Sequence, residues 1–183
     1  MKSLKEQIAE LRAAGYKALP AQAKVAHDAV LLAMHRSGFK LKSAIKGGVV
    51  MSSITGDIRR ATMDMDIDFV HHSISIRSIE QFVRGLNRVM PELKIGVVGK
   101  ITDLKHEDYR GKRVYVSIND GSLKRPLRTK IDIGVHTHDE MAQIERTFGS
   151  ARYMRKLESA QNNWLAVSPR LATETILKVV SSL

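Results

Sequence analysis

Two kinds of hydrophobic spacing alternate along the chain and predict its helices and strands. Apolar residues at helical spacing follow the capping-box pair Ser3 and Glu6. The same spacing occurs in a segment that begins at Pro20 and in another that ends at Pro91. Strict alternation or short apolar runs predict the strands. Helices are expected at about 4–11, 20–36, 78–90 and 171–180, and strands at 41–45, 63–70, 93–101, 113–118 and 127–135. This mixture predicts an α/β or α+β domain with a mixed sheet.

Turn signals connect these elements. Asn119-Asp120-Gly121 is strong turn chemistry before the last strand, which we expect to pair back as a hairpin with a connection longer than two residues. Gly38 is expected to end the second helix. Gly47-Gly48 follows the first strand, and a short helix is expected after it, with Gly56 as its C-terminal stop.

Apolar and acidic residues alternate without a break along the predicted strand at 63–70. The residues of one parity are apolar, and those of the other are three aspartates: Asp64, Asp66 and Asp68. Alternate residues on a strand lie roughly 6.5–7 Å apart, so these carboxylates repel one another when partly buried. A divalent ion such as Mg²⁺, which binds one or two carboxylates together with substrate phosphates, resolves that conflict. The alternative is a solvated acidic face, although Asp is depleted in strands.

The last predicted strand carries a matching polar face. Arg128, Lys130 and Asp132 share one parity along it. If it neighbours the aspartate strand, Asp132 adds a third carboxylate beside Asp64 and Asp66. Two metal ions roughly 3.5–4 Å apart would then fit, one activating the attacking oxygen and the other holding a triphosphate.

Candidate phosphate contacts precede the aspartate strand. The glycines of Gly47-Gly48 allow backbone N–H groups to approach a phosphate at a helix N-terminus. Arg59 and Arg60 could clamp phosphate oxygens bidentately. An ordinary tight turn and a solvated loop are the alternatives for these two segments.

The charge balance adds an expected partner. The formal net charge is +11 and the sequence pI is about 10.0, so the chain attracts polyanions such as nucleic acid or triphosphates. Lys124, Arg125 and Arg128 form a basic patch beside the proposed third carboxylate, which is either a track for RNA backbone or a solvated face. An aromatic fraction of 5% argues against a platform that stacks single-stranded bases.

The absence of cysteine means that any metal must be bound by oxygen or imidazole ligands. The N-terminus lacks the apolar run of a signal peptide, and no stretch approaches the roughly 18 apolar residues of a membrane span. We therefore expect a cytoplasmic protein without a membrane partner. We expect one domain over 1–183, with helical segments at 1–40 and 168–183.

Three strings of residues resemble a known family. Lys46-Gly47-Gly48 followed by Arg60-x-Thr62-x-Asp64-x-Asp66-x-Asp68 resembles the AbiEii/AbiGii-type toxin nucleotidyltransferases, within the DNA polymerase β-type superfamily. Lys130-Ile131-Asp132-Ile133-Gly134 resembles that family's third-carboxylate strand. Ser168-Pro169 followed by Glu174 and Lys178 resembles its helix with a functional lysine. The resemblance spans about 45–178, which is most of the chain.

The resemblance implies a nucleotidyltransferase-type mixed sheet flanked by helices. It also implies transfer of a nucleotide from an NTP to an acceptor, with Mg²⁺ or Mn²⁺ as the cofactor. Asp64, Asp66 and Asp132 are the implied metal ligands and catalytic carboxylates. Lys178 is a further implied catalytic residue. The implied nucleotide-binding residues are Lys46, Gly47, Gly48, Arg60, Thr62 and Lys130.

The resemblance also implies partners. In that family the acceptor is typically tRNA, at its 3′ end, or in some members a protein hydroxyl. Members act as the toxin of a toxin–antitoxin pair or in phage defence, so an antitoxin protein is an implied partner. Two features depart from the family pattern. Val49 replaces the hydroxyl residue that many members have after the glycines, and the chain stops at Leu183, so a shortened C-terminus is expected.

Two other functions compete with this interpretation. One is a degenerate nucleotidyltransferase fold that binds nucleic acid or a partner without chemistry, which the intact Asp64, Asp66 and Asp132 argue against. The other is a small-molecule nucleotidyltransferase of the antibiotic-modifying kind, which uses the same carboxylates. The strong positive charge disfavours it, because cationic acceptors prefer acidic pockets.

Overall fold

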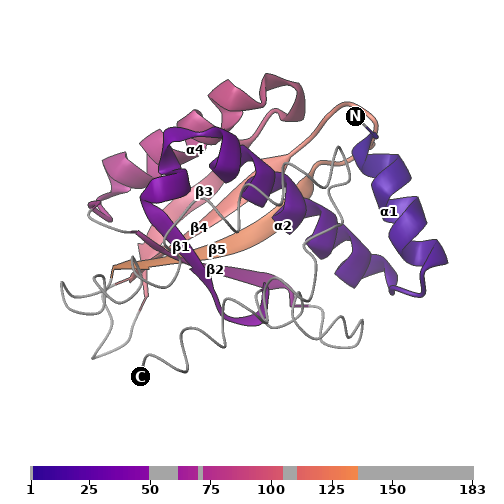
Figure 1. Ribbon diagram of the computed structural model, residues 1–183, viewed down its shortest axis with the longest axis horizontal. Helices are drawn as coiled ribbons and strands as arrows, with labels where there is room; N and C mark the ends of the chain where they lie inside the picture. The colour runs from indigo at the N-terminus through magenta and orange to yellow at the C-terminus, as the bar shows by residue number, and fades with distance from the viewer. Residues whose placement is uncertain (1, 50–61, 70–71, 105–110, 136–183) are drawn as a thin grey trace.

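A computed structural model describes residues 2–49, 62–69, 72–104 and 111–135 of the chain (Figure 1). Its centre is one five-stranded sheet in the order β1-β2-β5-β4-β3. The strands are β1 Ser43–Lys46, β2 Asp64–Phe69, β3 Gly96–Asp103, β4 Gly111–Ile118 and β5 Leu127–Val135.

The sheet is mixed, as the sequence predicts. The central pair β2 and β5 is parallel, whereas β1 with β2, β4 with β5, and β3 with β4 are antiparallel. The antiparallel pairing of β4 with β5 confirms the predicted hairpin, and Gly121 in its turn has a φ of +85°, which glycine adopts without strain. The parallel pair joins two strands that lie far apart in the sequence, and it carries the aspartates.

Helices cover one face of this sheet. They are α1 Leu4–Ala13, α2 Ala18–Arg36 and α4 Ile76–Val89, with short 3₁₀ helices η1 Gly38–Leu41 and η3 Pro91–Leu93. In Figure 1, α2 and α4 lie across the strands, and α1 lies beside α2 at one end of the sheet. Contacts join α2 to β5 and to α4, and α4 to β3. The helices and the sheet thus form two layers around one core.

The alternation within the strands explains the core. Side chains of one parity on the central strands are fully buried against the helices: Met65, Ile67, Phe69, Val114, Val116, Ile118, Ile131 and Ile133. Phe69 packs in an aromatic cluster with Phe39 and Phe82, at ring-centroid distances of 6.1 and 5.3 Å. The other parity, which includes the aspartates, is therefore directed to the opposite face of the sheet.

The N-terminus of α1 is capped twice. Ser3 and Glu6 form the predicted capping box. The turn between β4 and β5 adds a second cap, because the Leu4 N–H donates to Asp120 Oδ2 at 2.7 Å and the Lys5 N–H donates to Ser122 Oγ at 3.2 Å. This turn therefore fixes α1 to the end of the sheet.

Some predicted boundaries shift. Residues 38–41 form η1, so β1 begins later than expected and Ser37, not Gly38, caps α2. Residues 91–93 form η3, and β3 begins only after Lys94 has turned the chain with a φ of 42°. The helix expected after Gly47-Gly48 begins at Gly48, but Gly56 and the helix at 168–183 lie outside the described residues. No helix within those residues is long and apolar enough to cross a membrane.

Candidate active site

The register of the parallel pair places the aspartates side by side. Asp66 on β2 is the direct partner of Asp132 on β5, and Asp64 is the partner of Lys130. Paired residues on adjacent strands point to the same face, about 4.8 Å apart in the backbone. Asp132 therefore lies on the face that Asp64 and Asp66 occupy, as the shared parity predicts. The chemical roles of these residues stay predictions.

A row of four charged residues crosses the sheet at this level. Lys46 on β1 pairs with Asp66 on β2, which pairs with Asp132 on β5, which pairs with Arg113 on β4. The signs along the row are positive, negative, negative, positive. Because the two carboxylates occupy the centre, each repels the other while a cation flanks each on its outer side.

Three of the carboxylates on this face form ion pairs. Arg113 donates two hydrogen bonds to Asp132, from Nε to Oδ1 and from an Nη to Oδ2, each at 2.8 Å. Lys130 Nζ lies 2.7 Å from Asp64 Oδ2. Lys46 Nζ lies 2.8 Å from Oδ1 of Asp68, which is almost completely buried. Lys46 and Lys130, predicted to bind nucleotide, thus lie among the aspartates.

Asp66 is the carboxylate at the centre of these charges. Partial burial raises the pKa of the Asp66 carboxyl above its ordinary value, and the neighbouring Asp132 and Asp64 raise it further, against the opposing effect of Lys46 and Lys130. Burial and the neighbouring carboxylates thus make the charged form of Asp66 less favourable than in water. This is the electrostatic conflict that the aspartate strand predicts.

The glycine pair lies directly against this site. A Cβ at Gly47, where φ is +69°, would come within 2.2 Å of Asp66 Oδ2, and one at Gly48 would come within 2.8 Å of the Thr62 side chain. Neither position has room for a side chain. Thr62 forms a hydrogen bond with the first residue of β2, since its Oγ1 accepts from the Asp64 N–H at 3.3 Å. The predicted residues Gly47, Gly48 and Thr62 therefore pack around Asp66 and Asp64.

A buried histidine supports the site from the helix face. Nε2 of His27 on α2 lies 2.9 Å from Oγ1 of Thr129, which precedes Lys130 on β5. Burial lowers the pKa of His27 to about 4, an effect that Lys24 strengthens and that Asp64 and a hydrogen bond with the Met63 backbone oppose. His27 is consequently neutral at pH 7. It connects α2 to the starts of both aspartate-bearing strands.

The donor set can be tested against a divalent ion. Among the described residues, no three His, Asp or Glu side chains are arranged as a metal site. Asp132 and Asp64 instead form ion pairs with Arg113 and Lys130. In kind the donors fit, since the conditions that raise the pKa of the Asp66 carboxyl, burial and neighbouring carboxylates, are relieved by a hard cation that prefers oxygen ligands. Asp64, Asp66 and Asp132 are the residues that would hold it.

The predicted RNA-binding residues lie away from the aspartates. Lys124 and Arg125 are exposed in the turn that caps α1, and Arg128 is exposed at the start of β5 on the aspartate face. Arg128 lies roughly 13 Å along the strand from Asp132, at about 3.3 Å per residue. Arg60 and Lys178 lie outside the described residues.

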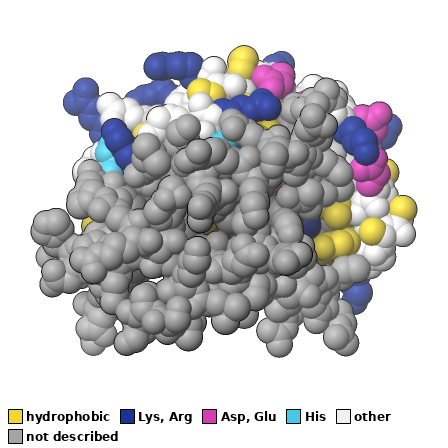
Figure 2. All heavy atoms as spheres, viewed as in Figure 1, with side chains coloured by type: hydrophobic (Ala, Val, Ile, Leu, Met, Phe, Trp, Pro, Cys, Tyr) yellow, Lys and Arg dark blue, Asp and Glu magenta, His cyan; other side chains and the backbone are white. Residues whose placement is uncertain are grey.

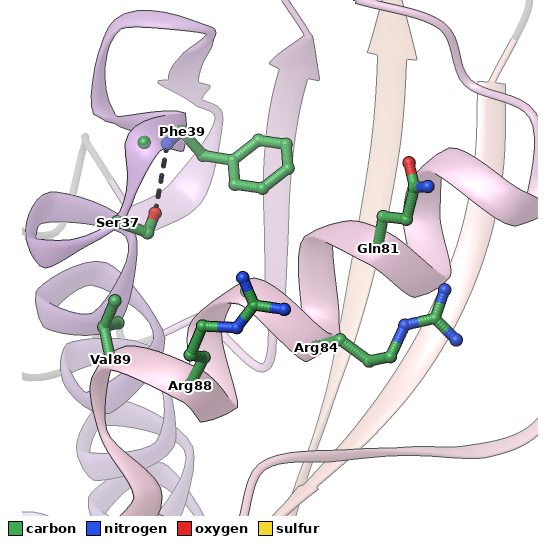
Figure 3. A pocket seen from close by; sticks show the side chains of 8 residues that line it. Ser37, Phe39, Gln81, Arg84, Arg88 and Val89 are labelled. Atoms are coloured by element: carbon green, nitrogen blue, oxygen red, sulfur yellow. Dashed lines mark hydrogen bonds between the residues drawn. The ribbon is translucent and has the colours of Figure 1, made fainter.

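A hollow lies on the helix layer, away from the aspartates. It has a volume of about 400 Å³ and is lined by Arg84 and Arg88 of α4 together with Phe39 and Ser37 (Figure 3). In Figure 2, Lys and Arg side chains gather along the upper edge of the molecule, where Figure 1 shows α4. None of the predicted site residues in the described part of the chain lines this hollow.

Arg113 is the site residue that the sequence interpretation missed. It lies in a segment correctly predicted as a strand, and its Asp132 partner was already a candidate. Parity along one strand cannot show which residue of another strand lies opposite. The predicted hairpin placed the two strands side by side, but its long connection did not determine which residues pair.

Comparisons with known proteins identify the family. The model of the nucleotidyltransferase AbiEii toxin family, of type IV toxin–antitoxin systems, matches residues 29–152, more than half of the chain. A comparison with curated proteins finds no match.

Two solved structures resemble the chain weakly, both from Bacillus subtilis. Small alarmone synthetase 2 is 16% identical, with 77% of this chain and 73% of that chain covered and a TM-score of 0.25. Small alarmone synthetase 1, bound to its product pppGpp, is 13% identical, with 81% of each chain covered and the same TM-score of 0.25. At this TM-score neither likeness bears on the function. The family match covers both aspartate-bearing strands and the glycine pair, and the chain belongs to the AbiEii family of nucleotidyltransferase toxins.

Proposed function

We propose that this protein transfers a nucleotide from an NTP to the 3′ end of a tRNA in a reaction that depends on Mg²⁺ or Mn²⁺. The observation that carries the proposal is the cross-strand pairing of Asp66 with Asp132, which concentrates carboxylates between Lys46 and Arg113. Membership of the AbiEii family supports transfer of a nucleotide as the chemistry.

In this reaction the 3′ hydroxyl oxygen forms a bond to the α-phosphorus of the NTP. The bond from that phosphorus to the oxygen that bridges the α- and β-phosphates breaks, pyrophosphate leaves, and the hydroxyl proton passes to solvent water. A bound divalent ion would neutralise charge on the phosphate oxygens. Asp64, Asp66 and Asp132 would hold the ion, while Lys46 and Lys130 would bind phosphate oxygens.

The glycine pair positions the NTP in this proposal. At Gly47 and Gly48 a Cβ would collide with the Asp66 and Thr62 side chains, so only glycine lets the backbone lie this close to them. Backbone approach to a phosphate is the common reason for glycine at such a position. Arg60 and Lys178 complete the proposed nucleotide and catalytic residues.

The proposed acceptor is a folded RNA because of the charge of the chain. A net charge of +11 favours contact with many phosphates, and the few aromatic residues disfavour base stacking. The exposed Lys124, Arg125 and Arg128 would contact RNA backbone. The protein would act in the cytoplasm as a toxin in phage defence, opposed by an antitoxin protein.

Incubation with each labelled NTP, with and without tRNA and Mg²⁺, tests the activity. The expected result is label at the tRNA 3′ end from one or a few NTPs, lost when the metal is chelated. Equal incorporation without metal would refute the metal dependence. Label on protein or on an aminoglycoside, with none on tRNA, would refute the acceptor.

The RNA patch has its own test. The double change Lys124→Gln and Arg125→Gln should weaken tRNA binding and lower the salt slope by roughly 0.7 to 0.9 for each lost phosphate contact. NTP affinity should stay unchanged, since neither residue lies among the aspartates. The double change Arg77→Gln and Arg84→Gln, which removes the same charge from exposed positions on α4, is the matched control. Equal effects of the two double variants would show that only net charge matters.

A further inference from the structure

Asp132 is held by the strongest ion pair on the aspartate face. The two planar groups meet as a fork, with both Asp132 oxygens accepting from Arg113 at 2.8 Å. The side chains are only partly exposed, at 35% for Arg113 and 16% for Asp132. A bidentate pair of this kind is stronger and geometrically stricter than a contact through one ammonium nitrogen, such as that of Lys130 with Asp64.

This pair competes directly with metal binding. A divalent ion at the proposed site needs an oxygen of Asp132, and both oxygens already accept hydrogen bonds from Arg113. A cation also repels the guanidinium that flanks the same carboxylate. Each Asp132 oxygen keeps a second lone pair, so it is the charge and position of the guanidinium beside the incoming ion that should loosen the pair when Asp132 binds metal.

The balance of charge on the face shows what Arg113 does without a ligand. Four carboxylates there, those of Asp64, Asp66, Asp68 and Asp132, are flanked by the three cations Lys46, Lys130 and Arg113. Among the described residues on this face, one negative charge is left over by this count. The site is thus nearly neutral on its own, and Arg113 is part of that neutrality.

Once Arg113 has left Asp132, the triphosphate of the NTP is a second anion that it could bind. A triphosphate bound to the carboxylates through a metal places phosphate oxygens on the same face of the sheet. The guanidinium fork fits two phosphate oxygens as well as it fits a carboxylate. Arg113 belongs to the charged row itself, two strands from Asp66, and it needs only side-chain rotation to leave Asp132.

We propose that Arg113 is an exchangeable clamp, the internal counter-ion of Asp132 in the free protein and a triphosphate-binding residue in the complex. When a metal ion takes the Asp132 carboxylate, Arg113 moves to the phosphate oxygens of the NTP. This inference rests on the proposed function and deepens it. It assigns Arg113 a specific ligand and makes metal and NTP bind cooperatively, because each removes one partner of the same ion pair.

Mn²⁺ binding without nucleotide tests the first half of the exchange. It can be followed by electron paramagnetic resonance for the wild type, Arg113→Gln, Arg113→Lys and Lys112→Gln. The Arg113→Gln protein should bind Mn²⁺ about tenfold more tightly than the wild type, equivalent to about 1.4 kcal/mol. Arg113→Lys, which keeps the charge but loses the fork, should fall between the two. Lys112→Gln is the matched control, since Lys112 precedes Arg113 on β4 but pairs with Asp103 and should leave the affinity unchanged.

Binding of a non-hydrolysable ATP or GTP analogue in saturating Mn²⁺ tests the second half. Arg113→Gln should weaken analogue binding about tenfold, so the same variant binds metal more tightly and nucleotide more weakly. A purely structural role would weaken both and lower the melting temperature of every Arg113 variant. A role as a simple metal repeller would tighten metal binding without affecting the analogue. Either of these results would overturn the exchange.

The proposed function can fail separately from this inference. A wild-type protein that binds Mn²⁺ and labels tRNA, while Arg113→Gln has wild-type affinity for metal and analogue, refutes the clamp alone. A wild-type protein that binds no Mn²⁺ at any pH from 6 to 9 refutes the metal-dependent function and the clamp together. The melting temperature of each variant shows whether an altered affinity comes from unfolding.

Discussion

The two faces of the central sheet use the same strands for opposite purposes. On the helix face, Met65, Ile67 and Ile131 are fully buried in a continuous apolar core. On the other face, their immediate neighbours Asp66 and Asp132 are charged residues held in cross-strand pairs. Successive residues of the same strand thus belong alternately to the apolar core and to the charged face.

The comparison teaches that the apolar face holds the charged face in position. Bringing Asp66 beside Asp132 raises the pKa of Asp66, which is a cost to the folded state at neutral pH. The arrangement persists because burial on the other face fixes the register of β2 and β5. Substitutions on the two faces should therefore have opposite consequences for stability and activity.

The largest expected effect is on activity, at the charged face. Asp66→Asn should lower nucleotide incorporation at least about 10³-fold, since removing a metal ligand forfeits several kcal/mol of charge stabilisation. The stability of the folded state should not be lowered. Because the folded pKa of Asp66 is raised, the carboxyl contributes stability below its ordinary value of 3.8 that is lost as pH rises through the folded pKa. The variant should therefore melt higher than the metal-free wild type at pH 7.

Melting scans and labelled-NTP incorporation, measured side by side, check this prediction. The gain in melting temperature should shrink as the pH is lowered toward 4. An Asp66→Asn protein with wild-type incorporation would show that the charged face is not the catalytic face.

The next effect is on stability, at the apolar face. Phe69→Ala should cost about 3–5 kcal/mol of the free energy of unfolding, because it opens a cavity in the aromatic cluster. Tyr115→Ala, on the charged face of β4 with 44% of its surface exposed, is the control and should cost much less. Urea denaturation measures both. Similar losses for the two would contradict the division between the faces.

A smaller effect is expected at the buried His27, which connects α2 to the starts of β2 and β5. The pKa of His27 is lowered from 6.5 to about 4, so its contribution to stability is present above pH 6.5 and lost as pH falls toward about 4. The loss is about 3 kcal/mol at about 1.4 kcal/mol per pKa unit. His27→Gln should remove this part of the acid sensitivity in urea denaturation at pH 7 and pH 4.5.

Thr129→Val separates the hydrogen bond from the titration. It should cost about 1 kcal/mol at pH 7, since it removes the hydroxyl 2.9 Å from Nε2, yet it should keep the pH dependence. If His27→Gln is as acid-sensitive as the wild type, other buried groups are responsible.

The smallest effect is expected away from both faces, at the cap on α1. Asp120→Ala should cost about 1 kcal/mol of unfolding free energy, because the Leu4 N–H loses its carboxylate partner. Hydrogen exchange should quicken at the start of α1 and stay unchanged in β2 and β5. A loss of protection throughout the sheet would instead mean that α1 and the sheet unfold as one unit.

Much of the local structure could be predicted from the sequence because it depends on near neighbours. Alternation located β2 and β5, and the capping box located the start of α1. Two of the boundaries that shifted are those where a 3₁₀ turn precedes a strand, at 38–41 and 91–93. Such turns have no hydrophobic period of their own, so the pattern merges them with the following strand.

The sequence by itself determined which residues share a face of each strand, since side chains alternate with a fixed period of two. It therefore determined that Asp64 and Asp66 lie together and that Asp132 shares its face with Lys130. Only the tertiary structure decided that β2 and β5 pair in parallel with Asp66 opposite Asp132, and that Arg113 lies beyond Asp132 in the same row. The physical reason is that strand order and register depend on how the apolar faces pack against α2 and α4, and no single strand contains that information.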